Sequence, residues 1–285
     1  RVPVVYTGHT QTDFDDVRFT SSNGTTPLDY WLETKTNGVS AVFWVEIPTI
    51  TASTTTTIYM YYGNGSASSA SNGTNTFDTF DDFDDGDYTG WTVSKEGSSG
   101  GAVTITNGQA VLTGASSLML HFLKDSPTNL QNFVFEVDTK ATDVSANNQM
   151  QIGMSFRAAD INNLYTTGFD LWESADTVVA GKRVGGSWTQ ITNASFASVS
   201  ETTYKLKATI NSTAIKFFVD DVQRISTTDS SISAGGKIGF NMDFGNSGAT
   251  DTVTLDNVRV RKFASTEPTV TVGSESAFVA ESTIS

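Results

Sequence analysis

Short alternating runs of β-branched and aromatic residues recur along the whole chain, and they constrain its fold more than any other feature. Glycine, asparagine and serine turns separate these runs, and helical periodicity is almost absent. In the clearest run, one face carries Val39, Ala41, Phe43, Val45 and Ile47. We therefore predict an all-β chain, in which Asn107-Gly108 closes a hairpin because both residues tolerate a positive φ.

The chain divides into two predicted domains at a stretch that has no large apolar residue to pack into a core. Its 285 residues are enough for two domains, and residues 63–76 read GNGSASSASNGTNT, which is typical of a linker. We predict a small β-sandwich over residues 1–75 and a larger two-sheet jelly roll over residues 76–264. Residues 265–285 extend past the closing strand as a tail, which still alternates as TVTV at 269–272.

Composition excludes several functions. Lysine and arginine total 17 against 31 aspartates and glutamates, a net charge of −14, so nucleic acid and anionic membrane surfaces are disfavoured partners. The charge fits a solvated extracellular protein or one that binds cations, or simply a soluble acidic surface. Cysteine is absent, which excludes disulfides, thiolate zinc sites and thiol nucleophiles. No apolar run approaches the ~20 residues of a membrane span.

Five N-x-[ST] triplets point to a secreted protein, because such triplets accept glycans only in that context. They begin at Asn23, Asn64, Asn72, Asn193 and Asn211. The chain opens abruptly on the strand-like run RVPVV, so we expect a mature or trimmed form. We expect an extracellular location at the cell surface.

Three blocks near the N-terminus carry a family resemblance. They are DVRF at 16–19, LDYWLE at 28–33 and YMYYGN at 59–64. Together they make residues 1–75 similar to a domain of unknown function from archaeal and bacterial surface proteins. The resemblance implies an architecture and a cell-surface context, but no chemistry.

A second resemblance covers residues 77–263. It rests on FDDF at 80–83 with GW at 90–91, on YKLKATINSTAIKFFVDD at 204–221, and on GGKIGF with VTLDNVRVRK in 235–262. These blocks resemble the concanavalin A-like lectin/glucanase superfamily in its laminin-G-like form. That superfamily holds lectins, structural modules and glycosidases, so the resemblance implies a fold and leaves the function open.

An acidic stretch opens the second domain. FDTFDDFDDGDYTGW, at 77–91, holds six aspartates, and calcium prefers six to eight oxygen ligands of this kind. The lectin-like resemblance implies a structural calcium ion between the first and last strands. Its candidate ligands are Asp82, Asp84 and Asp256. The alternative is a solvated acidic turn, with Asp256 capping the end of a strand.

The sequence argues against catalysis. Glucanases of the resembled superfamily carry an E-x-D-x-E strand, and a retaining mechanism needs two carboxyl groups about 5–5.5 Å apart. The nearest match is Glu136-Val-Asp138-Thr-Lys140, which has lysine in place of the second glutamate. The two histidines, His9 and His121, fit a turn and a largely apolar strand, and no G-x-S-x-G turn is present.

Aromatic and planar polar side chains on successive predicted strands suggest a sugar-binding sheet. Aromatic rings stack on the apolar faces of sugars, while amides, carboxylates and guanidinium groups bind the hydroxyls. The candidate ligand-binding residues are Tyr165, Trp172, Arg183, Trp188, Asn241 and Asp243. The alternative is that the aromatic residues belong to the core, as they usually do in sandwiches.

These observations predict a non-catalytic surface protein whose lectin-like module serves adhesion or glycan binding, with calcium as a structural cofactor. A first alternative is a structural subunit of an extracellular filament or surface layer. In that case the tail, unless it is a linker to a further domain, pairs as an added β-strand with a neighbouring copy. A second alternative is a glycoside hydrolase.

Overall fold

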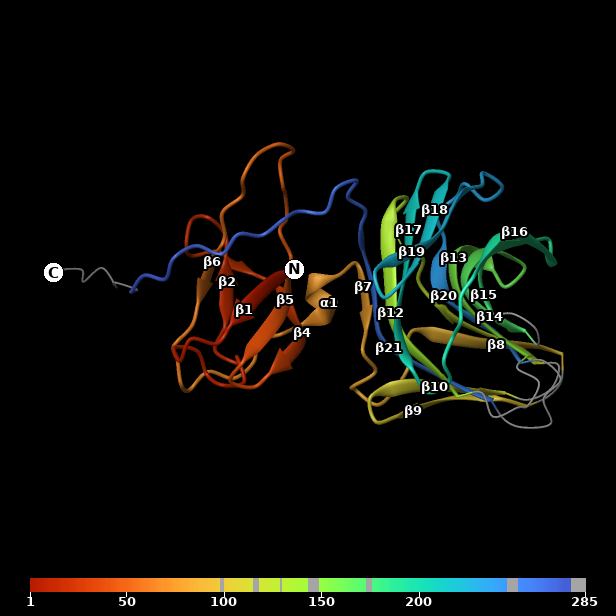
Figure 1. Cartoon of the computed structure of the whole chain (residues 1–285), viewed down its shortest axis with the longest axis horizontal. Helices are drawn as coiled ribbons and strands as arrows, with labels where there is room; N and C mark the ends of the chain where they lie inside the picture. Colours follow the sequence, from red (N-terminus) through yellow and green to blue (C-terminus); the bar gives the residue numbers. More distant parts are fainter. Residues whose placement is uncertain are drawn as a thin grey trace. The chain divides into compact units, whose positions relative to one another are not determined.

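The computed structural model describes residues 1–97, 100–114, 118–128, 130–142, 149–172, 176–244 and 251–277. The chain forms two compact units (Figure 1), the first running from Arg1 to Asn72 and resuming at Ala264, the second spanning Gly73–Phe263. Sequence placed the boundary three residues later and left the tail apart from both domains. Within the described residues, the single turn of helix α1 (Gly73–Thr76) is the only α-helix, and the all-β prediction is confirmed.

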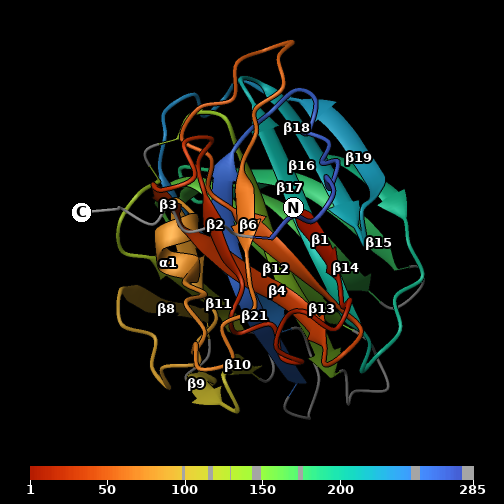
Figure 2. The same ribbon diagram turned by 90° about the vertical axis from the view of Figure 1, so that its left-hand side faces the viewer.

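Unit 1 is a small sandwich of two three-stranded antiparallel sheets (Figure 2). One sheet has the order β1 (Val2–Val5), β5 (Ser40–Val45), β4 (Tyr30–Thr36). The other has the order β3 (Pro27–Leu28), β2 (Arg18–Thr20), β6 (Tyr59–Tyr61).

Aromatic side chains form the core of unit 1. Phe19, Tyr30 and Phe43 meet edge to face with ring centroids 5.3–5.7 Å apart, the arrangement that aromatic quadrupoles favour. The hydroxyl of Tyr30 donates a hydrogen bond of 2.6 Å to the carbonyl of Val17, so this polar group is satisfied inside the core. These three rings come from different strands and join the two sheets.

The tail lies against unit 1 without forming a strand. Residues 264–277 carry no regular structure, and Val270 and Val272 are 44% and 60% exposed. Glu275 contacts the ring of His9, with Nδ1 and Oε1 2.7 Å apart, and a hydrogen bond joins it to Tyr62. Polar contacts of Glu275 thus hold the tail to unit 1, and its two valines are not among the buried residues of the core.

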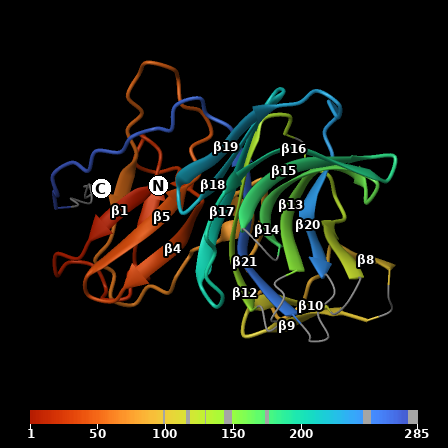
Figure 3. The same cartoon turned by 45° about the vertical axis from the view of Figure 1, so that its right-hand side comes forward.

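Unit 2 is a sandwich of two large antiparallel sheets (Figure 3). The eight-stranded sheet has the order β19 (Val222–Thr228), β18 (Ala214–Val219), β17 (Thr203–Asn211), β12 (Phe133–Thr142), β21 (Asp251–Lys262), β10 (Gln109–Gly114), β9 (Ala102–Thr106), and β7 (Thr79–Asp81) pairs with β21. The seven-stranded sheet has the order β16 (Ser187–Ser195), β15 (Thr177–Val184), β14 (Asn163–Trp172), β13 (Gln149–Asp160), β20 (Lys237–Phe244), β11 (Leu118–Lys124), β8 (Trp91–Gly97).

The core of unit 2 fills the space between these sheets. Its largest members include Phe133 and Phe135 of β12 and Phe156 and Phe240 of the opposite sheet, none of which is exposed. Because side chains alternate along a strand, each strand of the seven-stranded sheet also presents a second set of residues on its outer face. The predicted hairpin at Asn107-Gly108 is confirmed, since it joins β9 to β10.

Candidate functional site

The outer face of the seven-stranded sheet is the candidate site, and strand register defines it. On β20, Phe240, Met242 and Phe244 point into the core, so Asn241 and Asp243 lie on the outer face. Asn241 pairs with Gly153 of β13 and His121 of β11, while Asp243 pairs with Gln151 and Met119. These pairs place polar residues from at least three neighbouring strands side by side.

A buried polar cluster occupies the middle of this face. The amide oxygen of Asn241 accepts hydrogen bonds of 2.9 Å from the Ser155 hydroxyl and 2.7 Å from the Thr166 hydroxyl. All three residues are buried, although they lie outside the core. A Cβ at Gly153 would stand 2.1 Å from Thr166 Oγ1 and 2.4 Å from Asn241 Oδ1. Glycine is therefore required beside this cluster.

A charged cluster lies next to it. Arg183 of β15 donates to both carboxylate oxygens of Glu96 on β8, with Nη2 and Oε1 3.1 Å apart, and its Nε donates to the carbonyl of Gly186. His121 Nε2 lies 3.2 Å from Glu96 Oε2. The hydrogen bond from Arg183 lowers the pKa of Glu96, while burial lowers the pKa of His121.

Two carboxyl groups flank Gln151. Asp170 of β14 and Asp243 of β20 both pair in register with Gln151, one on each side of β13. Burial raises the pKa of both carboxyls, and for Asp243 the negative charge of Asp170 adds to the effect. The pair therefore holds protons more tightly than ordinary aspartates do, and each protonated group could donate as well as accept a hydrogen bond.

Trp188 supplies an accessible aromatic ring at the edge of the same sheet. It pairs in register with Arg183, and its side chain is 43% exposed. A Cβ placed at Gly181 would come within 2.2 Å of the indole ring, so the ring lies directly over that glycine. An exposed indole resting on bare backbone leaves its other surface open to a ligand.

The structure brings four of the six predicted ligand-binding residues to this face, namely Arg183, Trp188, Asn241 and Asp243. Trp172 ends β14, and its side chain lies outside the described residues. The prediction that Tyr165 binds a ligand is wrong. Its ring is fully buried in the core, stacked on Phe156, and cannot contact a sugar. Its hydroxyl donates a 2.6 Å hydrogen bond to Asp229. Consecutive residues of a strand face opposite sides, and the neighbours of Tyr165 place it inward.

Sequence reasoning missed Glu96 and Asp170, and it placed His121 in the core or at an edge. His121 does lie buried, but on the outer face and beside a charged pair. The alternation of side chains along the strand could have indicated Asp170. Its neighbours Phe169 and Leu171 are both apolar and face the core, so Asp170 faces outward. The Glu96–Arg183 contact joins residues 87 positions apart, and no local pattern indicates it.

The proposed calcium ligands lie near one another only in part. Asp84 N donates to Asp82 Oδ1 over 3.4 Å, and Asp84 lies against the turn at Gly108. Burial raises the pKa of Asp256, with smaller contributions from the charges of Asp138 and Asp84, and Gln109 donates to its carboxylate. Across the part of the chain that the structure describes, no three acidic or histidine side chains are grouped closely enough to hold a metal ion.

The E-x-D-x-K strand forms ion pairs. Glu136 is 4% exposed, and its Oε2 lies 3.4 Å from Arg259 Nε and 3.5 Å from Arg261 Nε. Lys140 pairs with Glu201 over 3.0 Å. Glu136 thus neutralises two buried or half-buried cations, which suits a structural role.

The predicted glycan acceptors are all on the surface. Every one of the five asparagines is exposed: Asn23, Asn64, Asn72, Asn193 and Asn211. Asn23 organises its own turn, because its amide oxygen accepts the backbone N–H groups of Thr25 and Thr26. Accessibility is necessary for modification, and glycosylation stays a prediction.

Comparisons with known proteins bear on both units. Residues 13–94 match a family described as domain of unknown function (DUF2341), and no curated protein matches the chain. Among solved structures, the potassium-bound carbohydrate recognition domain of Emp46p aligns with a TM-score of 0.50 and 13% identity, over 62% of this chain and 90% of that domain. A β-glucanase from Bacillus licheniformis aligns with a TM-score of 0.50 and 15% identity, over 65% of this chain and 98% of that enzyme.

These likenesses, at such low identity, show the fold alone. The predicted architecture is confirmed: the chain is an all-β protein whose larger unit is a jelly roll of the kind found in carbohydrate recognition domains and glucanases. Among the described residues, no helix is long and apolar enough to cross a membrane.

Proposed function

We propose that the protein is a non-catalytic glycan-binding protein of the cell exterior, which holds its ligand on the outer face of the seven-stranded sheet. The observation that carries this proposal is the position of Trp188, an exposed indole on the same face as Asn241, Asp243 and Asp170. An aromatic platform beside planar hydrogen-bonding groups is the combination that sugars require, since a sugar has both apolar faces and hydroxyl edges.

Fold and composition support the proposal. A structure of the same fold is a carbohydrate recognition domain, and the charge of −14 disfavours anionic ligands. The negative charge of the protein would repel a sulfated polymer or a polymer of uronic acids, whereas a neutral glycan carries no charge and would not be repelled. Screening the whole chain on an array of neutral and acidic glycans tests the proposal. Binding to neutral glycans is expected, and an array without any specific signal would contradict it.

Glycoside hydrolysis is the second candidate, and a specific pair favours it. Asp170 and Asp243 have raised pKa values and flank one residue on the outer face, and a raised pKa is what a general acid needs. Release of reducing sugar from a bound glycan, lost in both Asp170→Asn and Asp243→Asn, would establish it. Binding of a glycan without its hydrolysis would exclude this candidate and support the non-catalytic function.

Strand exchange is the third candidate, favoured by the tail. TVTV at 269–272 alternates as a strand does, yet it pairs with no strand among the described residues, and its valines are exposed. A second copy could accept this segment as an added strand. Light scattering should then show large assemblies that disappear on deletion of residues 265–285. Full-length protein that stays monomeric at all concentrations would exclude it.

Calcium belongs to this proposal as a structural ligand. Support comes from Asp256, whose pKa is raised mainly by burial and to a smaller extent by the charges of Asp138 and Asp84, because a cation beside these carboxylates would offset both effects. Backbone carbonyls would have to complete the coordination sphere, since too few side chains meet there.

A further inference from the structure

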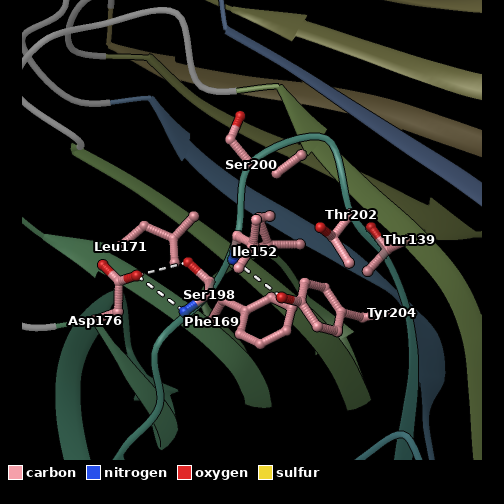
Figure 4. Close-up of a pocket in the computed structure, with 11 residues that line it drawn as sticks. Thr139, Ile152, Phe169, Leu171, Asp176, Ser198, Ser200, Thr202 and Tyr204 are labelled. Atoms are coloured by element: carbon pink, nitrogen blue, oxygen red, sulfur yellow. Dashed lines mark hydrogen bonds between the residues drawn. The ribbon is translucent and has the colours of Figure 1, made fainter.

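A cavity of about 100 Å³ opens between the two sheets of unit 2 (Figure 4). Its walls are residues that face the inside of the sandwich, so it is separate from the outer face described above. The floor is apolar and consists of Ala141, Ile152, Phe169 and Leu171. The rim carries the hydroxyl groups of Thr139, Ser198, Ser200, Thr202 and Tyr204, together with the carboxylate of Asp176.

The connection from β16 to β17 closes this cavity, and several hydrogen bonds fix it in place. Asp176 Oδ2 accepts bonds of 3.1 Å from the backbone N–H of Ser198 and 2.6 Å from its hydroxyl. The N–H of Glu201 donates to the carbonyl of Ala141, 2.9 Å away. The connection is thereby fastened to strands of both sheets, so the cavity has a defined shape rather than a collapsed one.

One hydroxyl at the rim is placed to meet a ligand. The oxygen of Tyr204 accepts a 3.0 Å hydrogen bond from the N–H of Val199, so its own proton can be donated to a ligand oxygen. Thr139 donates its hydroxyl proton to the carbonyl of Thr254, which leaves lone pairs on Thr139 Oγ1 as acceptors. Tyr204 thus supplies a donor and Thr139 an acceptor above the apolar floor, beside the further hydroxyl groups of the rim.

We propose that this cavity binds a small uncharged ring compound that carries one hydroxyl group, such as a phenol or a cyclic alcohol. The volume is about two thirds of that of an engineered apolar cavity in another protein, about 150 Å³, which binds benzene, so the hydroxyl end of the ring compound would lie in the opening at the rim. Ile152, Leu171 and Phe169 provide the apolar contact, and Tyr204 with Thr139 bonds the hydroxyl. The carboxylate of Asp176 at the rim disfavours anions.

Phenol is the probe, and methyl NMR of the whole chain is the measurement. Phenol should shift the methyl signals of Ala141, Ile152 and Leu171 in a saturable way, while signals of unit 1 stay constant. Benzoate, which replaces the hydroxyl by a negative charge on the same ring, should leave them unchanged. Phenol without effect on these methyls, or benzoate binding as tightly as phenol, would overturn the proposal.

Two variants separate the contribution of the Tyr204 hydrogen bond from that of the apolar contacts in the cavity. Tyr204→Phe should weaken phenol about five- to tenfold, the effect of one hydrogen bond, and should leave benzene binding unchanged. Ala141→Phe should fill the cavity and abolish binding of both, whereas Ala214→Phe, outside the cavity, should not. Equal phenol affinity in wild type and Tyr204→Phe would overturn the assigned hydroxyl contact, even if Ala141→Phe failed to fold. Glycan binding on the outer face is measured separately and does not enter this test.

Discussion

The guanidinium group of Arg183 on β15 meets the carboxylate of Glu96 on β8, although four strands separate β15 from β8 in the sheet. In a flat sheet those five steps would span about 24 Å, far more than an arginine side chain reaches. The seven-stranded sheet is therefore strongly curled, so that residues near its two edges come together on the outer face. This curvature explains why polar residues such as Ser155 and Thr166 are buried there.

The Glu96–Arg183 pair should stabilise the fold in a pH-dependent way. The pKa of Glu96 is lowered from its ordinary value of 4.5, so its contribution is fully present above that value and is lost as pH falls through the folded-state pKa. At pH 7, Glu96→Gln should lower the free energy of unfolding by about 1 kcal/mol. Thermal unfolding from pH 7 to pH 3 should show the two proteins converging. A constant difference across this range would contradict the assignment.

Tyr165 should matter for stability and not for sugar binding. Tyr165→Phe removes the hydrogen bond to Asp229 and leaves that carboxylate with one partner fewer, at a cost of about 1–2 kcal/mol. Tyr59→Phe, at an exposed position of β6, is the matched control and should cost nothing measurable. Urea denaturation compares them. Loss of glycan affinity in a folded Tyr165→Phe protein would argue that the ring reaches the ligand after all.

Gly153 should not tolerate a side chain. A methyl group there collides with Thr166 Oγ1 and Asn241 Oδ1, so Gly153→Ala should destabilise the protein by about 1–3 kcal/mol and disturb the polar cluster. Gly273→Ala in the tail, where a Cβ meets nothing within 4 Å, serves as control. The readout is the midpoint of urea unfolding. If both variants unfold at the wild-type midpoint, the tight packing around Gly153 is wrong.

Calcium should raise the unfolding temperature if the acidic turn holds it. At a concentration 100 times the dissociation constant, a ligand specific to the folded state adds about 2.7 kcal/mol. Calorimetry with calcium and with a chelator measures this difference. Asp256→Asn should abolish it, and Asp13→Asn in unit 1 should not. Identical unfolding temperatures with and without chelator would show that calcium does not stabilise the folded protein.

The fold was largely predictable, because alternation and turn residues report strands directly. The run from Val39 to Ile47 gave β5, and Asn107-Gly108 gave a hairpin. No alternating apolar run marks strand β19, since its sequence VQRISTT is mostly polar and it lies at the edge of a sheet, where little burial is required. The second half of strand β4, through Thr36, is likewise exposed and polar, so the sequence does not define where this strand ends.

The candidate site was predictable only where the alternation of side chains along a strand is enough to tell which face of the sheet a residue occupies. Asn241 and Asp243 alternate with three core residues, so their outward direction follows from the sequence. Tyr165 was misplaced because an aromatic residue fits either face. The contact of Arg183 with Glu96 depends on sheet curvature, which arises from packing across the whole domain and leaves no trace in local sequence.

Titration calorimetry of a neutral glycan selected on the array tests the central claim most directly, with wild type, Trp188→Ala and Tyr59→Ala compared under the same conditions. Trp188 and Tyr59 are similarly exposed, but only Trp188 lies on the outer face of the seven-stranded sheet. Trp188→Ala should weaken binding about threefold to tenfold or more, and Tyr59→Ala should bind as wild type does. Equal affinity of all three proteins would show that the glycan does not bind on this face.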